Sequence, residues 1–371
     1  MDNGIFKLEQ KILQGLNKGR PLKTLVGFDG YVDELVRVVE RRVNAEHCTY
    51  YADISGFAGR VEAAAGKSAD IEIVTEAVKL GGNAPIMANA LACLGVNTVC
   101  VGAMGYPKLH EIFSNMPEKC RCISICDPAH TCAFEFDDGK LMFGNLKPLE
   151  QITWGLIKDR VGLEYLIRLF DEVQLFALVN WSGIIDAKDV WEGVFCDILP
   201  KLSKARRQAF FDMADPSGKS ETDILVALKQ ISAFSEYCDV TLGLNENEAL
   251  CICKALGGAK ERPLEEIGQE LYRRLGIKTV LIHPVERCIA VTENGILCEE
   301  GHVVASPKIS TGGGDNFNAG FCAGQILGLD ISDSMLLGMA VSGYYVQNGY
   351  SPTWNKLEGI CEPCMDDNRE S

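Results

Sequence analysis

Long hydrophobic runs are absent from this sequence of 371 residues. No apolar stretch approaches the roughly 18 residues of a transmembrane helix, and the first residues mix charged with apolar side chains where a signal peptide needs an uninterrupted apolar core. Basic residues are also scarce, since 36 Lys and Arg stand against 51 Asp and Glu and give a formal net charge of −15. This balance argues against nucleic-acid and membrane partners. We therefore expect a cytoplasmic protein that binds small molecules, and the charge of a phosphorylated ligand must be neutralised by a local site or a metal.

Several motifs of well-known enzyme classes are missing as well. Two Gly-Lys-Ser triplets, at 66–68 and 218–220, lack the glycine that a P-loop needs five residues earlier, where Val61 and Met213 stand. No G-x-G-x-x-G follows a strand, and neither H-E-x-x-H nor G-x-S-x-G occurs. P-loop, dinucleotide oxidoreductase, zinc protease and serine hydrolase functions therefore lose their usual support.

Cysteine is plentiful, with 16 residues spread along the chain. A chain of this length buries a core without covalent help, and it shows no export signal, so we expect reduced thiols and no disulfide framework. Cys361-Glu-Pro-Cys364 is a lone C-x-x-C with no second pair or nearby histidine. That is a weak zinc signal, and we expect no structural zinc.

Strands and helices alternate strictly from about residue 150. Apolar, β-branched runs predict strands at 175–179, 208–213, 238–244 and 278–283, after an earlier one at 23–28. Helical patterns lie between them, at 159–171, 186–204, 220–234, 245–256 and 263–275. This alternation predicts a mainly parallel sheet flanked by helices, with ligands at the carboxyl ends of the strands.

Two segments do not fit the alternation. Residues 44–75 are polar and rich in small side chains, and 121–143 read as short strands around a hairpin signal at Asp137-Asp138-Gly139. We expect them to form a small inserted β lid of residues 44–75 and 120–145. The α/β core would then comprise residues 1–43, 76–119 and 146–371.

The strongest functional motif runs from Ser310 to Phe317, with the sequence STGGGDNF, and leads into a helical pattern. Its three glycines, Gly312, Gly313 and Gly314, expose backbone N–H groups at the positive end of a helix dipole, which makes an anion site. Asp315 beside them suits a base that takes a proton from a hydroxyl attacking phosphorus. It equally suits a simple helix cap, and the residues alone leave both interpretations open.

Two further motifs stand at predicted helix starts. Gly81-Gly82-Asn83 opens a helical pattern at 83–95 and is typical either of a ligand contact or of a plain turn with a helix cap. Asn245, followed by Glu248, comes after the strand at 238–244 and matches a capping box. The functional alternative places Glu248 near a Mg²⁺ ion and its waters.

In this order the motifs resemble those of the PfkB (ribokinase-like) carbohydrate kinase family. GGNAPIMANALACLGVNTVCVGAMG is similar to its N-terminal signature and TGGGDNFNAGF to its C-terminal signature, while Asn245…Glu248 matches its N-x-x-E motif. The segment GFDGYVDE (27–34) stands where the family has sugar-binding polar residues. The resemblance extends from about residue 22 to 348, and it implies a ribokinase-like α/β fold with a small β lid.

The resemblance also implies roles for individual residues. Asp315 would be the catalytic base, and Gly312 to Gly314 the anion hole. The implied substrate contacts are Asp29, Asp33, Gly81, Gly82, Asn83 and Asn180. The implied nucleotide contacts are Asn245, His283 and Asn348, with Glu248 binding Mg²⁺ through water. ATP and Mg²⁺ would be the cofactors, and a homodimer would form through the lid.

We expect an ATP-dependent kinase that phosphorylates a hydroxyl of a sugar or sugar-like molecule. One alternative is a nucleoside kinase of the same family, because Phe28, Tyr31 and Phe57 offer an aromatic platform for a base. Another is a non-catalytic ligand-binding homologue, because Ile309-Ser310 and His283-Pro284 replace the Asp-Thr and the Thr and Gly usual in the family.

Overall fold

A nine-stranded sheet forms the centre of the α/β body, in the order β14-β13-β12-β11-β10-β9-β1-β5-β6. The computed structural model describes residues 10–12, 14–15, 19, 21–259, 262–301, 304–305, 307–309 and 311–357. The strands of this sheet are β1 (Lys23–Phe28), β5 (Asn97–Ala103), β6 (Cys120–Cys126), β9 (Leu175–Leu178), β10 (Arg207–Asp212), β11 (Cys238–Leu244), β12 (Thr279–Ile282), β13 (Arg287–Thr292) and β14 (Gly295–Glu300). Neighbours from β12 to β6 run parallel, and β13 and β14 add an antiparallel edge. The expected mainly parallel sheet is confirmed.

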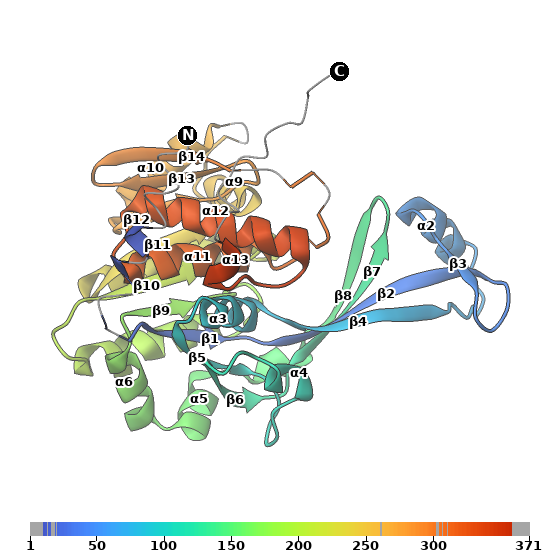
Figure 1. Ribbon diagram of the computed structural model, residues 1–371, viewed down its shortest axis with the longest axis horizontal. Coiled ribbons are helices and arrows are strands. Elements are labelled where there is room, and N and C mark those ends of the chain that lie inside the picture. Colours follow the sequence, from blue (N-terminus) through green and yellow to red (C-terminus); the bar gives the residue numbers. More distant parts are fainter. Residues whose placement is uncertain are drawn as a thin grey trace.

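Helices cover both faces of this sheet, as Figure 1 shows. They are α3 (Asn83–Cys93), α4 (Glu111–Ser114), α5 (Trp154–Val161), α6 (Leu163–Glu172), α7 (Ala187–Gly193), α8 (Glu221–Ala233), α9 (Glu246–Ala255), α10 (Leu264–Leu275), α11 (Gly313–Leu327), α12 (Ile331–Asn348) and α13 (Trp354–Leu357). Short 3₁₀ or π segments are η1 (Lys147–Gln151), η2 (Val194–Ile198), η3 (Leu199–Lys201), η4 (Pro216–Gly218) and η5 (Phe234–Glu236).

The two faces of the sheet carry separate hydrophobic cores. Leu25 of β1 belongs to a core that includes side chains of α5 to α10, whereas its neighbour Val26 belongs to a core that includes side chains of α3, α11 and α12. Successive residues of a strand point to opposite faces, so a strand covered on both sides needs a continuous apolar run. This is why β1, β9 and β12 have apolar sequences that were recognisable without the structure.

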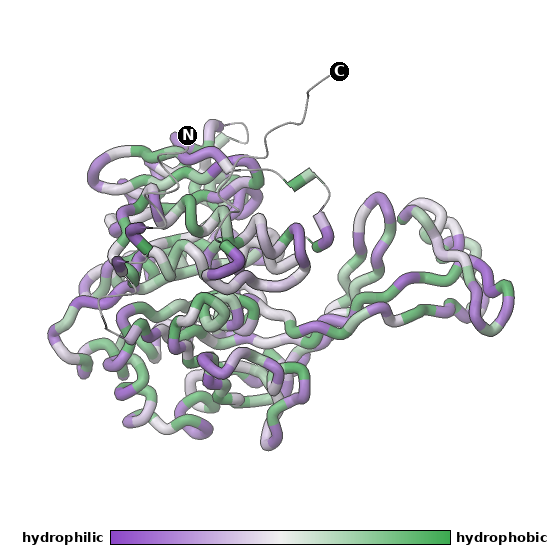
Figure 2. Tube along the Cα trace, in the orientation of Figure 1, coloured by the Kyte–Doolittle hydropathy of each residue, from purple (hydrophilic) through white to green (hydrophobic). Residues whose placement is uncertain are grey.

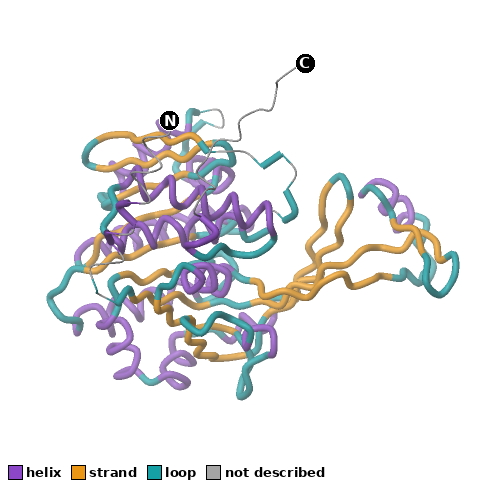
Figure 3. Tube along the Cα trace, viewed as in Figure 1, coloured by secondary structure: helices purple, strands orange, loops and turns teal. Residues whose placement is uncertain are grey.

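A small sheet extends away from the body, with helix α2 (Ile54–Glu62) near its far end (Figures 1 and 3). Its strands are β2 (Tyr31–Arg42), β3 (Cys48–Tyr50), β4 (Ile73–Gly81), β7 (Ala129–Phe136) and β8 (Gly139–Asn145). β2 is central and pairs with β3, β4 and β7, while β7 and β8 form the expected hairpin around Asp137 and Asp138. Phe57 of α2 packs on Val38 and Phe136 and closes a small separate core.

The expected boundaries between the lid and the core were wrong in both lid segments. β6 belongs to the large sheet, because it pairs in parallel with β5, Cys122 opposite Cys100. β2 and most of β4, which were assigned to the core, build the small sheet instead. A short apolar or alternating run predicts a strand but does not show which of the two sheets the strand joins, because that depends on its pairing partner.

Apolar and hydrophilic stretches succeed one another along the described part of the chain, as Figure 2 shows. Accordingly, none of the described helices has the length and apolar character needed to cross a bilayer. Ser310 and the pair Cys361 and Cys364 lie outside the described residues.

Candidate functional site

Polar side chains gather where the parallel strands of the large sheet end. Asp29 follows β1, Asn180 follows β9, Asp212 ends β10, Asn245 follows β11 and His283 follows β12. The N-termini of α3 and α11 face the same edge, because a Cβ on Gly312 at the start of α11 would lie 3.3 Å from Ile86 of α3. The carboxyl edge of the sheet therefore brings together motifs that are more than two hundred residues apart in sequence.

The glycine loop, Thr311 to Gly314, is fixed in place from several sides. Gly312 has φ 89°, a left-handed conformation that suits glycine, and a Cβ there would lie 2.8 Å from the Tyr345 hydroxyl. Tyr345 donates its hydroxyl hydrogen to the Thr311 carbonyl (3.0 Å), and the Asn316 amide donates to the Gly312 carbonyl (2.8 Å). The loop is therefore preorganised at the N-terminus of α11.

Asp315 lies in the first turn of α11 and is only 8% exposed. Gly312 is the N-cap, and no side chain of the described residues caps this helix. The helix-cap interpretation of Asp315 is therefore wrong. Burial raises the pKa of the Asp315 carboxyl well above its usual range, and the nearby charges of Asp212 and Asp29 raise it further. A buried carboxyl of raised pKa beside backbone donors has the properties of a proton acceptor in a reaction at an anion site.

Asp29 is completely buried and holds three parts of the site together. Its carboxylate accepts hydrogen bonds from the backbone N–H groups of Asn83 (2.9 Å) and Ala84 (2.8 Å) and from the Asn180 amide (2.6 Å). Burial raises its pKa to about 6. Gly82 is required beside it, because a Cβ there would lie 2.9 Å from the Asp29 carboxylate. Asp29 thus fixes the N-terminus of α3.

Asn180 supports the same arrangement. It adopts φ 56°, accepts a hydrogen bond from the Gly183 N–H (3.0 Å), and lies 3.4 Å from the Tyr31 hydroxyl through its amide nitrogen. Asparagine tolerates this left-handed conformation better than most residues. Its amide is therefore occupied by protein partners on both sides.

Asp33 differs from Asp29 because it stands on the small sheet and lines a cavity. This cavity lies between β2, β4 and β8 on one side and the glycine loop on the other, and its walls include Lys79, Thr311 and Tyr345. Gly81 makes room for the carboxylate, since a Cβ there would come within 2.3 Å of it. Burial raises the pKa of Asp33, opposed by a hydrogen bond with Thr131. Of the two aspartates, Asp33 is the one that lines a cavity, which has a volume of about 20 Å³.

Asn245 and Glu248 form the capping box that their spacing predicts. The Asn245 side chain accepts from the Glu248 N–H (2.9 Å), and Glu248 accepts from the Asn245 N–H (2.9 Å). The carboxyl of Glu248 is nevertheless buried, and burial together with the charge of Asp212 raises its pKa to about 8. No group of three or more His, Cys, Asp or Glu side chains in the described part of the chain is arranged to bind a metal ion directly.

His283 lies against α11, and Asn348 is the last residue of α12. The His283 ring stacks on Phe317 at a centroid distance of 4.4 Å and lies beside Gly314, and burial lowers its pKa to about 4, so the ring is neutral. Asn348 ends α12 and donates its amide to the Tyr344 carbonyl (2.9 Å).

Sequence reasoning missed several residues of this site. Asp212 is 6% exposed and accepts hydrogen bonds from the Ala214 N–H (2.6 Å) and from the Asn318 amide (2.7 Å). Its position at the end of a predicted strand was the available signal. Lys140, by contrast, reaches Thr311 across 171 positions of sequence, and no local pattern predicts that contact.

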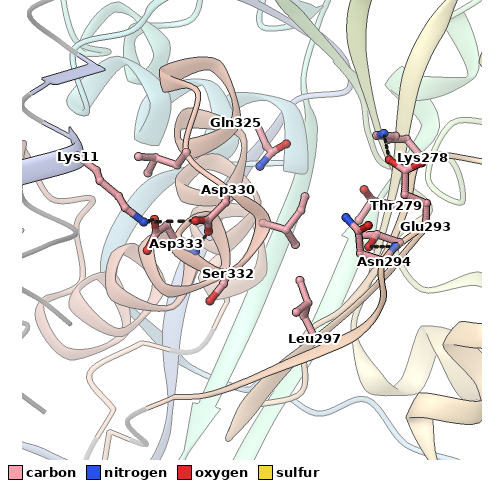
Figure 4. A pocket seen from close by; sticks show the side chains of 13 residues that line it. Lys11, Lys278, Thr279, Glu293, Asn294, Leu297, Gln325, Asp330, Ser332 and Asp333 are labelled. Carbon is pink, nitrogen blue, oxygen red and sulfur yellow. Dashed lines mark hydrogen bonds and ion pairs between the residues drawn. The ribbon is translucent and has the colours of Figure 1, made fainter.

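A second cavity, of about 650 Å³, lies at the opposite end of β12. Figure 4 shows its walls, which include Lys278 and Glu293 beside the large sheet and Lys11, Asp330 and Asp333 around the start of α12. None of the candidate site residues lines it. The two lysines are already paired there, Lys278 with Glu293 and Lys11 with Asp330 and Asp333.

Known proteins are similar to this chain over nearly its whole length. The family model for prokaryotic ketohexokinases matches residues 7–363. A ketohexokinase from Haloferax volcanii is 28% identical over 349 residues, which cover 93% of this chain and 92% of the relative. These matches confirm the resemblance to the carbohydrate kinases.

Solved structures of low sequence identity share the fold. A ribokinase from Thermotoga maritima has a TM-score of 0.59 and 17% identity, and the alignment covers 92% of this chain and 99% of that one. A candidate ribokinase II from E. coli, solved in complex with ATP and Mg²⁺, has a TM-score of 0.63 and 12% identity over 92% of this chain and 99% of that one. The ribokinase-like fold is therefore confirmed.

Proposed function

Because the chain belongs to the prokaryotic ketohexokinase family and is an ATP-dependent sugar kinase, we propose that its acceptor is a ketohexose and that Asp315 is the catalytic base. The family does not favour the nucleoside kinase alternative, and kinase membership argues against a homologue without turnover. The curated relative that is named a ketohexokinase supports the choice of sugar.

The observation that carries this proposal is the position of Asp315 directly behind the glycine loop, buried and without a capping role. Its carboxylate takes the proton of the sugar hydroxyl as the hydroxyl oxygen forms a bond to the γ-phosphorus of ATP and the bond to ADP breaks. The raised pKa makes the ionised carboxylate a better proton acceptor. The N–H groups of Gly312 to Gly314 stabilise the charge on the group in transfer.

Asp33 and Asn83 are the proposed sugar contacts, because Asp33 lines the cavity and the Asn83 side chain is near enough to the base to lower its pKa. Asp29 and Asn180 are proposed not to touch the sugar but to hold the N-terminus of α3, which carries Asn83, in place. The small sheet covers the sugar from the side of β2 and serves as the lid.

The carboxyl groups present suit Mg²⁺. Glu248 and Asp212 are buried close enough that the charge of Asp212 raises the pKa of Glu248, and a divalent cation relieves such repulsion. Mg²⁺ keeps several waters and binds through phosphates and one or two carboxylates, so Glu248 and Asp212 suffice. When bound, Mg²⁺ supplies positive charge to the phosphate oxygens of ATP. His283 and Asn348 are proposed to contact the nucleotide.

The proposal is tested by incubating the protein with ATP and Mg²⁺ and with ketohexoses, aldohexoses or adenosine in parallel, followed by mass spectrometry of the products. We expect a ketohexose monophosphate as the main product and ADP in equal amount. Preferred phosphorylation of an aldohexose or of adenosine would contradict the proposed substrate. Tight sugar binding without any ADP release would contradict the catalytic role.

A further inference from the structure

The small sheet presents a charged face to the glycine loop. In the register of its strands, Lys79 pairs with Asp33, Asp33 with Thr131, and Lys140 with Glu135. Directly paired residues share a face of a sheet, and residues two apart on one strand do so too. Lys79, Asp33, Glu135 and Lys140 therefore lie on one face, opposite the one that α2 covers through Phe57.

Lys140 spans the cavity between the two parts of the protein. Its ammonium group lies 3.3 Å from the Thr311 hydroxyl and 3.1 Å from the Glu135 carboxylate. Thr311 immediately precedes the three glycines, so this cation stands at the positive end of α11, where like charges repel. An anion between them would remove that repulsion, and the backbone N–H groups of the glycines already favour one there.

Lys79 adds a second cation to the same cavity. It is half-buried, lines the cavity with Lys140 and Thr311, and forms no ion pair within the described residues. Burial lowers its pKa, the charge of Glu135 opposes this change, and the charges of Lys140 and Lys308 lower the pKa further, so three lysines lie within electrostatic reach of one another. Clustered like charges cost free energy unless a ligand of opposite charge binds. In a chain of net charge −15, this cluster is a local exception.

We propose that Lys79 and Lys140 bind the phosphoryl group in transfer from the side of the small sheet, opposite the N–H groups of the glycine loop. This inference rests on the proposed kinase function and extends it to the small sheet. Closure of this sheet over the sugar then delivers positive charge to the reacting phosphoryl group. The two lysines could equally bind a phosphate that the acceptor sugar already carries, because its chemistry is the same. The experiment separates these two sources of phosphate, the group in transfer and the acceptor.

The test compares Lys140→Met and Lys79→Met with wild type for turnover and for sugar affinity. It also compares their affinity, in the presence of sugar, for ADP with Mg²⁺ and aluminium fluoride, which together mimic the phosphoryl group in transfer. Loss of one charged donor to such a group costs about 10² to 10³ in rate. We expect Lys140→Met to lower turnover about a hundredfold, with affinity for the mimic reduced in parallel and sugar affinity within about threefold. Lys140→Arg keeps the charge. Its turnover should exceed that of Lys140→Met by at least about fivefold, which is a third of the hundredfold loss on a logarithmic scale.

A matched variant distinguishes this role from a general loss of charge. Lys67→Met removes the same charge from an exposed position beyond α2 and should keep turnover within about threefold of wild type. If Lys67→Met is as damaging as Lys140→Met, or if Lys140→Met and Lys79→Met both keep wild-type turnover, the inference is wrong.

A comparison of two acceptors, a neutral ketohexose and its monophosphate, shows whether the lysines bind the group in transfer or a phosphate on the sugar. A role at the group in transfer predicts the same loss with a neutral ketohexose and with its monophosphate. A loss confined to the phosphorylated acceptor would overturn the proposal and assign the lysines to the sugar. Absence of turnover in the wild type would contradict the kinase function itself, whereas an active wild type with fully active lysine variants contradicts only the role of the lysines.

Discussion

Replacement of Asp29 by Asn should change how the stability of the protein depends on pH. The side chain is completely buried, and its pKa rises from an ordinary value near 3.8 to about 6. The folded state therefore binds this proton more tightly than the unfolded state, so ionisation of Asp29 lowers the free energy of unfolding as pH rises from about 4 to above 6. A shift of about two units corresponds to about 3 kcal/mol in full.

Most of this change in the free energy of unfolding falls in a pH range where the protein can be studied. Linkage gives a loss of about 2 kcal/mol between pH 4.5 and 7.5 for a carboxyl with these two pKa values. Asn has the shape of the carboxyl group and does not titrate, so the variant lacks this loss. We expect the free energy of unfolding of wild type minus that of Asp29→Asn to fall by about 2 kcal/mol over this range.

Urea denaturation of both proteins at pH 4.5, 6.0 and 7.5, without nucleotide or sugar, measures the difference. Asp70→Asn, at an exposed position of the small-sheet region, is the control and should differ from wild type by a constant amount. A difference between wild type and Asp29→Asn that stays constant, or grows with pH, would refute the argument that Asp29 is a buried carboxylate holding the N-terminus of α3.

Further predictions concern the sugar and metal contacts. Asp33→Ala should weaken ketohexose affinity by more than about tenfold, since a hydrogen bond to a charged group contributes about 1.5–3 kcal/mol; calorimetric titration with the sugar measures it, and a change within threefold would remove Asp33 from the site. Glu248→Gln should raise the Mg²⁺ concentration for half-maximal turnover by at least about threefold while sugar affinity stays constant. An unchanged Mg²⁺ requirement would leave Glu248 with its capping role alone.

The strands of the large sheet were predictable from sequence because both faces of the sheet are covered. β9, β10, β11 and β12 begin and end within a residue or two of the predicted ranges. Their apolar runs follow from burial on both sides, and the polar residues at their ends mark the carboxyl edge. The start of α11 at the glycine loop was predictable for a local reason, since the three glycines and the helical pattern after them mark a helix start.

The small sheet was not predictable in the same way. β2 carries charged residues at Asp33, Glu34 and Arg37, because one of its faces lines a cavity and part of its length is exposed. Such a strand lacks a simple apolar pattern, and its partners come from three separate segments of the chain. Pairing of this kind depends on tertiary contacts.

The same reason explains the missed site residues. Lys140 was part of a predicted hairpin strand, yet its contact with Thr311 exists only because the small sheet and α11 meet in space. The role of Asp29 was likewise only partly visible. Its position after β1 was evident, whereas its three hydrogen-bond donors come from α3 and from the segment after β9.

The central claim is that Asp315 takes the proton in phosphoryl transfer, and the turnover of Asp315→Asn with ATP, Mg²⁺ and a ketohexose tests it most directly. Asn keeps the shape of the side chain and removes its basicity, and a positioned base contributes about 10² to 10⁴ in rate. We predict a fall in turnover of at least about a hundredfold, with thermal stability and ATP binding preserved. A variant that folds, binds ATP and retains more than about a tenth of wild-type turnover would contradict the account, because a positioned base contributes more than that.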